Sequence, residues 1–409
     1  MESEISQLGP TVVSEKAYQF VAPHDSRFWI RFFDRFLARY LRKNFGIESW
    51  ELKGAEKLAA SLKAGHGILL VPNHPRPSDP MALGLIIRQV NQPFYIMASA
   101  HLFLQSRFQS WLLPRIGAFS VYREGLDRES LKTAINILTD ARRPLVVFAE
   151  GVVTRTNDRL INLQDGVAFI ARTAAKQRAE TTPPGRVMVH PLAVRYTFKG
   201  DLEKSLAPVL DKIERRLSWQ PQRGMNIAGR VSKLGHAVLA LKEMEYFGAA
   251  QSGATPERVE GLLNRVLEPL ELEWLKGRSE GTAVNRVKNL RKAILPDLIA
   301  GDVPEAERLR RWKQLFDLEV AQQIYHFPPD YLGDSPTPER LIETVERYEE
   351  ALGNPNPTVH RPMHLCFEIG DAIEVNPVRD RRAPSDPLMD QIRASLTTML
   401  DINNDPPQK

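Results

Sequence analysis

Short apolar runs alternate with amphipathic stretches over residues 50–200, and this alternation limits the possible folds more than any other feature. The runs are GILLVPNH (67–74), PFYIMAS (93–99), GAFSVYR (117–123), PLVVFAEG (144–151) and RVMVHPLAVRY (186–196). Helical patterns lie between them, as at 127–143 and 165–178. Continuous apolar strands between helices predict an α/β fold, with a mainly parallel sheet covered by helices on both faces. Ligands bind such sheets at the carboxyl ends of the strands.

Residues 200–360 lack strand patterns and favour a series of helices. The expected helices span 202–218, 225–247, 255–276, 283–299, 304–325 and 337–352. Strand character returns at 364–375, followed by a helix at 384–402 and a disordered tail. We therefore predict an N-terminal arm with one helix (1–48), an α/β domain (49–200 and 361–403), and a large helical insertion before the last strand (201–360). No internal repeat is evident.

Cysteine usage and the N-terminus limit the class of protein. The 409 residues include one cysteine, Cys366, which excludes a disulfide framework and a cysteine zinc site and fits a reducing compartment. The first residues, MESEISQLGP, lack the pattern of a secretory leader. No apolar run reaches the roughly 18 residues that a membrane span needs. We expect a cytoplasmic protein, peripheral on a membrane where it meets one, and the net charge of +5 permits contact with an anionic surface.

The stretch SRFWIRFFDRFLARYLRKNFG (26–46) predicts a helix with an aromatic face and a basic stripe. Ser26 suits the N-cap and Gly46 the end of this helix. Its basic stripe consists of Arg27, Arg31, Arg35, Arg39 and Lys43. Such a helix can lie in a membrane interface, with its rings among acyl chains and its cations among lipid phosphates. The alternative is a helix packed on the domain with its arginines in water.

The segment NHPRPSDP (73–80) follows the first apolar strand and carries a candidate catalytic pair. A neutral imidazole of His74 could take a proton from a hydroxyl as that hydroxyl attacks a carbonyl. A carboxylate of Asp79 on the other ring nitrogen would fix the tautomer and stabilise the imidazolium. Asp79 followed by Pro80 is also a typical helix start, so Asp79 could serve only as an N-cap.

Polar residues follow two further strands. Glu150 and Arg155 come after the run at 144–151, and Arg123 comes after the run at 117–123. Two arginines at neighbouring strand ends could share one phosphate through charge-assisted hydrogen bonds. A surface ion pair in a loop is the alternative for Glu150 and Arg155. The later strand at 187–196 suits an acyl channel or ordinary core.

Four blocks in this order resemble the glycerolipid acyltransferase family, which includes lysophosphatidate and glycerol-3-phosphate acyltransferases. The first block, N-H-x-x-x-x-D, is matched by Asn73, His74 and Asp79, and the second, G-x-x-x-x-x-R, by Gly117 and Arg123. The third, F-P-E-G-T-R-S-R, is matched at Phe148, Glu150, Gly151 and Arg155, and the fourth, an apolar strand with a proline, by Pro191. The resemblance covers about residues 50–200 and 364–402, and does not extend to the helical insertion.

The resemblance implies an O-acyltransferase that uses His74 as general base and Asp79 as its partner. It implies that Asn73, Arg123, Glu150, Gly151 and Arg155 belong to the substrate site. The implied donor is acyl-coenzyme A or acyl carrier protein, without a further cofactor, and the implied acceptor is a lysophospholipid or glycerol-3-phosphate-type hydroxyl compound.

The third block departs from the family pattern, which leaves alternatives open. Val152 and Val153 stand where the family has threonine and its first arginine, so one cation of the phosphate site is missing. Arg76 could supply that charge. The alternatives are an acyltransferase with a non-phosphate acceptor, and a member of the same fold that acts as a lipid-binding or membrane-adaptor protein.

Neither nucleic-acid binding nor metal chemistry is favoured. Basic clusters at 286–292 and 308–313 are interleaved with leucine and isoleucine at helical spacing, as in the solvated faces of packed helices. The histidines are scattered, and none lies in an H-E-x-x-H arrangement.

Overall fold

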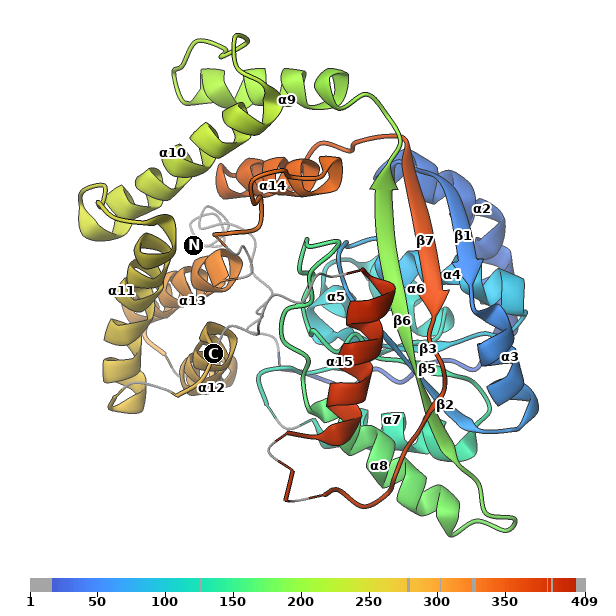
Figure 1. Ribbon diagram of the computed structural model, residues 1–409. Helices are drawn as coiled ribbons and strands as arrows, with labels where there is room; N and C mark the ends of the chain where they lie inside the picture. The colour runs from blue at the N-terminus through green and yellow to red at the C-terminus, as the bar shows by residue number, and fades with distance from the viewer. Residues whose placement is uncertain are drawn as a thin grey trace. The chain divides into compact units, whose positions relative to one another are not determined.

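The chain forms two compact units, shown in Figure 1. The computed structural model describes residues 17–125, 127–277, 280–301, 303–325, 329–380, 382–383 and 385–401. One unit comprises 19–200 and 359–409, and the other comprises 1–18 and 201–358. The predicted disordered tail and residues 1–16 of the predicted N-terminal arm lie outside the described residues.

The first unit contains one mixed sheet with the order β1-β7-β6-β2-β5-β3-β4, and β8 pairs with β6. The strands are β1 (Ile47–Lys53), β2 (Gly67–Pro72), β3 (Tyr95–Ser99), β4 (Ala118–Val121), β5 (Leu145–Val146), β6 (Val187–Phe198), β7 (Met363–Ile369) and β8 (Ile373–Glu374). The five strands from β6 to β4 are parallel, whereas β7 and β8 run antiparallel to β6. The predicted α/β fold with a mainly parallel sheet is confirmed. The single strand expected at 364–375 is instead two strands, interrupted after Ile369.

Helices cover both faces of this sheet. They are α2 (Arg27–Phe45), α3 (Ala55–Lys63), α4 (Asp79–Val90), α5 (Ala100–Leu104), α6 (Arg107–Arg115), α7 (Arg128–Asp140), α8 (Gly166–Ala179) and α15 (Pro387–Met399). From β2 to β4 the chain moves towards one edge of the sheet, and from β4 to β6 it moves back. Right-handed crossovers therefore place α4, α5 and α6 on one face and α7 and α8 on the other. A core of aliphatic side chains from β2, β6, α7, α8 and α15 fills the second face.

Strand β1 was not predicted from the sequence. Its sequence, IESWELK, alternates charged and apolar residues, and most of its side chains are exposed because β1 is the edge strand. It pairs in parallel with β7, from Ile47 opposite Met363 to Lys53 opposite Glu368. A half-exposed strand gives no continuous apolar run, so the pattern that identified the central strands does not identify it.

Helix α2 begins and ends where the sequence predicts. Ser26 occupies the N-cap position without a side-chain capping bond, and Gly46 ends the helix in the left-handed conformation, with φ 69°. The residues before α2 are held at the edge strand β4, because Val21 and Ser120 exchange hydrogen bonds. The residues of the predicted N-terminal arm directly before α2 are therefore fixed to the α/β unit.

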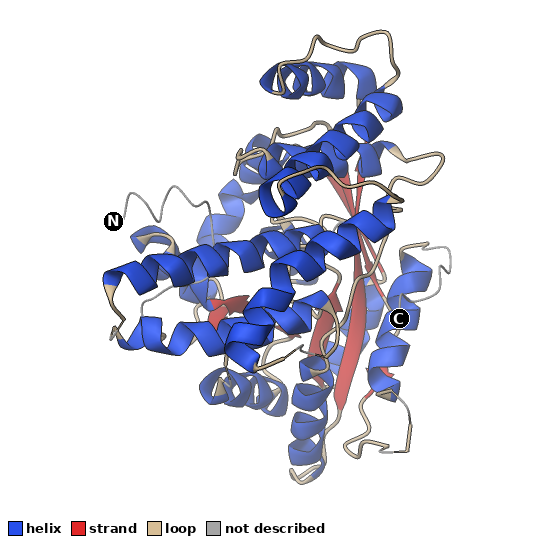
Figure 2. Cartoon of the chain, turned by 90° about the vertical axis from the view of Figure 1, so that its left-hand side faces the viewer, coloured by secondary structure: helices blue, strands red, loops and turns tan. Residues whose placement is uncertain are grey.

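The helical unit is inserted between two paired strands. Phe198 at the end of β6 lies opposite Met363 at the start of β7, and the Lys199 N–H donates to the Pro362 carbonyl at 2.9 Å. Residues 201–358 therefore leave and rejoin the sheet at adjacent points. Among its described residues this unit contains helices and no strand (Figure 2). The helices are α9 (Leu202–Arg216), α10 (Ile227–Phe247), α11 (Thr255–Leu275), α12 (Ala283–Ala300), α13 (Glu305–Tyr325) and α14 (Pro338–Ala351).

Ion pairs at the joints of α9 to α12, each with a buried glutamate, show a repeat that the sequence analysis missed. In each pair, an arginine near the start of one helix binds a glutamate near the end of the preceding helix through two nitrogen–oxygen contacts of 2.7–3.0 Å. The pairs are Arg230–Glu214, Arg258–Glu243 and Arg286–Glu271. The arginines recur every 28 residues, each four residues after its N-cap. The expectation that the chain contains no internal repeat was therefore wrong for α10 to α12.

The basic clusters noted in the sequence take part in the same kind of pairing. Arg291 binds Glu319, and Arg311 binds Glu307 and Asp297, all within the helical unit. The apolar residues between them form a core that joins α11, α12 and α13. These cations therefore contribute to contacts between helices.

Candidate active site

His74 follows the carboxyl end of β2, and its imidazole is hydrogen-bonded to Asp79. The distance from His74 Nδ1 to Asp79 Oδ2 is 2.8 Å. Asp79 is fully buried, whereas the His74 side chain remains 12% exposed. The structure therefore brings the predicted pair together and leaves the imidazole in reach of solvent.

The Asp79 carboxylate accepts three hydrogen bonds. Oδ2 also accepts from the Arg76 backbone N–H at 2.9 Å, and Oδ1 accepts from the Tyr196 hydroxyl at 2.6 Å. Because an ionised carboxylate can only accept, the imidazole donates its Nδ1–H. The ring lone pair then lies on Nε2, which is the tautomer that a general base needs.

These contacts also correct the predicted helix start. Ser78, not Asp79, occupies the N-cap position of α4. Asp79 is the first residue of the helix, and its oxygens bind His74, Arg76 and Tyr196. The capping interpretation of Asp79 was wrong because these groups already use its carboxylate.

The backbone of His74 is held by the loop that follows β5. Glu150 Oε1 accepts the His74 N–H at 2.7 Å, and the Thr154 N–H donates to the His74 carbonyl at 2.9 Å. The Phe148 ring lies against the imidazole, with ring centroids 4.1 Å apart. Residues of the third sequence block therefore hold His74, of the first block, in place through direct contacts.

Two asparagine side chains continue the hydrogen bonding along β6 beyond the point where β2 ends. Asn73 accepts from the Val194 N–H at 2.7 Å and donates to its carbonyl at 2.9 Å. Asn157 makes the same pair of bonds with Tyr196, at 2.6 and 2.7 Å. Each amide therefore replaces a neighbouring strand. The loops that carry His74 and Thr154 are fixed to the same strand as a result.

Glu150 lies beneath these loops with both oxygens engaged. Oε1 binds the His74 N–H, and Oε2 accepts from the Ile161 N–H at 3.1 Å. Burial raises the pKa of Glu150 to about 7 and outweighs the two amides, which favour the ionised form. The described contacts of Glu150 make it a support for the loops.

The raised pKa of Glu150 predicts a pH-dependent stability. The folded protein binds the Glu150 proton more tightly than the unfolded chain, so its contribution to stability is present below pH 4.5 and is lost as the pH rises to about 7. Compared with Glu150→Gln, the wild-type free energy of unfolding should fall by about 3 kcal/mol over this range. Urea denaturation of both proteins at several pH values measures this difference, and a constant difference would contradict the prediction.

The comparison with protein families agrees with this geometry. The model of the acyltransferase family matches residues 50–195, a stretch that contains His74, Asp79 and Glu150. Residues 50–195 form an acyltransferase-family domain. No curated protein matches the chain. The family supports acyl transfer as the general activity.

The predicted arginines of the acyltransferase domain follow strands that are not adjacent. Arg123 follows β4 and Arg155 follows the β5 segment, and β3 lies between those strands. The expectation that these strand ends are neighbours was wrong, because β3 pairs with both β4 and β5 and so separates them. Arg155 is half-buried, with φ 49°. Arg76 is half-buried, and its guanidinium lies over the Tyr196 ring, 5.3 Å from the centroid.

The glycines of the acyltransferase motifs are required by the backbone. Gly117 has φ 95°, and a Cβ there would come within 2.5 Å of the Phe94 carbonyl oxygen. Gly151 has φ 73° and donates its N–H to the Phe148 carbonyl at 3.0 Å. Both glycines have a backbone conformation that residues with a side chain rarely adopt.

Sequence reasoning missed three residues that position the His74–Asp79 pair of the acyltransferase domain. They are Tyr196, Thr154 and Asn157, which contact Asp79, His74 and β6 as described above. Thr154 occupies the serine position of the family's third block, which was a usable signal. Tyr196 lies near the end of the apolar strand β6, and nothing in the sequence indicates that its hydroxyl meets a residue more than 100 positions earlier.

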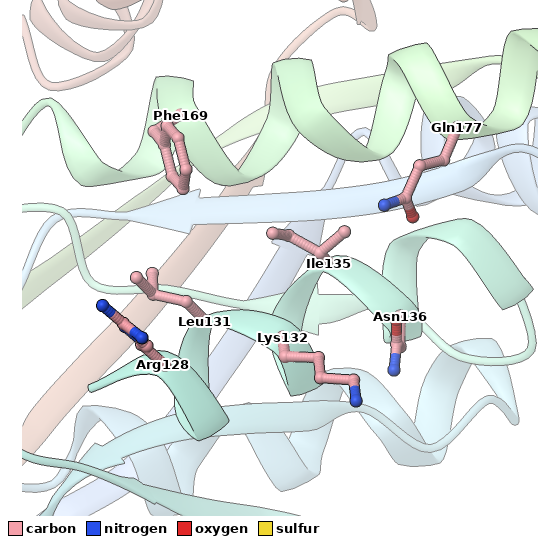
Figure 3. Close-up of a pocket in the computed structure, with 7 residues that line it drawn as sticks. All are labelled: Arg128, Leu131, Lys132, Ile135, Asn136, Phe169 and Gln177. Atoms are coloured by element: carbon pink, nitrogen blue, oxygen red, sulfur yellow. The ribbon is translucent and has the colours of Figure 1, made fainter. Parts of the chain in front are cut away.

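A pocket of the acyltransferase domain lies away from these motifs. Figure 3 shows its lining side chains on α7 and α8. The pocket has a volume of about 390 Å³. Its lining residues are Arg128, Leu131, Lys132, Ile135, Asn136, Phe169 and Gln177. None of the predicted site residues is among them. Within the described part of the chain, no group of three His, Cys, Asp or Glu side chains could hold a metal ion.

Proposed function

We propose that the protein is an O-acyltransferase that moves a fatty acyl group from an acyl thioester to a hydroxyl of a lysophospholipid or glycerol-3-phosphate-type acceptor. The observation that carries this proposal is the His74–Asp79 pair in an acyltransferase-family domain. The donor is acyl-coenzyme A or acyl carrier protein. No further cofactor is needed, because the thioester is itself an activated acyl group.

In this proposal His74 acts as general base. The acceptor hydroxyl gives its proton to Nε2 as its oxygen attacks the thioester carbonyl. Asp79 stabilises the imidazolium through Nδ1–H. The tetrahedral intermediate then releases the thiolate, the imidazolium returns the proton to it, and the oxygen ester remains. The enzyme therefore needs no serine nucleophile of its own.

The acceptor's charge would be met by arginines. Arg123 and Arg155 are the family-matched candidates, and Arg76 is the cation nearest to the pair in the chain. Each charge-assisted hydrogen bond that they made to a phosphate would contribute about 1.5–3 kcal/mol. Val153 stands where the family pattern has its first arginine, and Val152 stands where it has threonine. The missing cation favours a second candidate function, which is acyl transfer to an acceptor without a phosphate.

We place this reaction in phospholipid synthesis at a membrane surface in the cytoplasm, because lysophospholipid acceptors and the lipid products reside in bilayers. None of the helices in the described part of the chain is both long enough and apolar enough to cross a membrane. Contact would therefore be peripheral, and the basic aromatic helix α2 is the candidate for it.

The test is thiol release from acyl-coenzyme A and from acyl carrier protein, with a panel of acceptors. The panel contains lysophosphatidate, glycerol-3-phosphate and an uncharged lysolipid. Release that depends on an acceptor is the expected result, together with formation of the oxygen ester by mass spectrometry. Preference for the uncharged lysolipid would favour the second candidate. No acceptor-dependent release from either donor would contradict the proposal and leave a lipid-binding role for the fold.

A further inference from the structure

Helix α2 presents a row of exposed aromatic rings. Phe28, Phe32, Phe36 and Tyr40 follow one another at four-residue intervals, and Phe28 and Phe36 are 66% and 56% exposed. The opposite side of α2 packs on α4. There Leu37 lies so close to Gly84 that a Cβ on that glycine would come within 2.5 Å of Leu37 Cδ2. The aromatic row is therefore not the side by which α2 is held to the domain.

Helix α6 extends this aromatic surface. The Trp111 ring lies 4.9 Å from the Trp29 ring and 6.4 Å from the Phe33 ring, measured between centroids. On α6 itself, Phe108 stacks on Trp111 and is 59% exposed. Leu104 at the end of α5 is exposed as well. Segments separated by about 60 residues in the chain thus form one apolar surface, which we call the α2–α6 surface.

Cations border the α2–α6 surface, and acidic residues are scarce there. Exposed basic residues on the two helices are Arg27, Arg31, Arg35, Arg39, Arg42, Lys43 and Arg107. Arg115 lies over the Trp111 ring at 4.5 Å. The one acidic residue of α2, Asp34, is bound by Arg88 through two nitrogen–oxygen contacts of 3.0 Å, and α5 and α6 contain none.

We propose that the α2–α6 surface binds an anionic lipid bilayer, with Phe36 and Phe108 inserted among the acyl chains and the arginines at the lipid phosphates. Rows of rings beside rows of cations match the layers of a bilayer interface. Each arginine or lysine near an anionic bilayer strengthens binding about fivefold. This inference deepens the proposed function, because it names the surface by which the enzyme would meet lipid acceptors.

Vesicle flotation without substrates tests the proposal. We expect the wild-type protein to float with vesicles of phosphatidylcholine and phosphatidylglycerol, and much less with phosphatidylcholine alone. Phe36→Ser and Phe108→Ser should each weaken binding about tenfold, since each removes a ring from the bilayer. Leu272→Ser on α11 is the matched control, because Leu272 is 71% exposed in the helical unit and should not affect flotation.

Several results would overturn the inference. One is equal flotation of Phe108→Ser and wild type, and another is flotation that does not depend on the anionic lipid. Binding to neither kind of vesicle would leave a protein partner as the occupant of the surface. Since His74 lies outside the α2–α6 surface, His74→Ala should float like the wild type, so a failure of catalysis and a failure of membrane binding remain distinguishable.

Discussion

Replacing His74 with alanine is expected to lower kcat about a thousandfold, because a positioned general base contributes about 10²–10⁴-fold to a rate. KM should change much less, since the imidazole takes the proton during the reaction and not during binding. Acceptor-dependent thiol release at saturating donor and acceptor measures both constants. A variant with more than a tenth of wild-type kcat would show that His74 is not the base.

A second histidine provides the matched control for this variant. His364 on β7 is also partly buried, and its Nδ1 is 2.8 Å from the Ser49 hydroxyl. His364→Ala removes a similar side chain and hydrogen bond outside the site, so it should retain nearly full activity.

Asp79→Asn tests the tautomer of the His74 imidazole directly. It keeps the shape of the side chain but removes the carboxylate that receives Nδ1–H, and it should lower kcat by a similar factor.

Replacing Arg230 with methionine is expected to lower the free energy of unfolding of the helical unit by about 3–5 kcal/mol. Arg230 and Glu214 are each 1% exposed, and Arg230 also binds Asp211 Oδ1 at 2.7 Å. Removal of the guanidinium leaves the buried Glu214 carboxylate without its arginine, whereas Asp211 keeps its contact with Arg223. Urea denaturation followed by circular dichroism measures the change.

An exposed ion pair in the same unit serves as the control. Arg310 binds Glu307 on α13 and Glu273 on α11, and its side chain is half-exposed. Arg310→Met should cost less than about 1 kcal/mol, because solvent screens exposed pairs. Similar losses for the two variants would show that burial does not determine the strength of these pairs.

The fold was predictable where side-chain burial has a simple period along the chain. The central strands are buried on both faces and give continuous apolar runs, and the insertion helices fall within a few residues of the predicted ranges. Strand β1 was missed because only one of its faces is covered. The short strand β8 was merged with β7, since the turn between them has no strong breaking residue other than Gly370.

From the residue pattern alone, the site was predictable only where its residues are close in the sequence, and Glu150 was assigned to it through the family resemblance. His74 and Asp79 are five residues apart, and a turn and the first residue of a helix bring them together. Tyr196 and Asn157 reach the site through the register of β6 with its neighbours, which depends on the packed sheet. The distance between Arg123 and Arg155 depends on the order of the strands in the sheet, which the sequence pattern does not specify.

The helical repeat was missed for a related reason. Between α10, α11 and α12 the identical positions are few, namely the arginine of the ion pair, the valine directly after it, and the leucines four and nine residues after it. Exposed positions between them differ freely, because solvent imposes little constraint on them. Only the ion pairs of the folded unit show which scattered identities belong together.

The insertion point between β6 and β7 has an evolutionary consequence. Since Lys199 and Pro362 are hydrogen-bonded neighbours, a two-residue hairpin turn could replace the whole helical unit and still join the two strands in register. The tip of this hairpin is thus a place where a complete folding unit can enter or leave a gene in one event. Such an event would leave β6, and the asparagine contacts that hold the loops of His74 and Thr154 to it, unchanged.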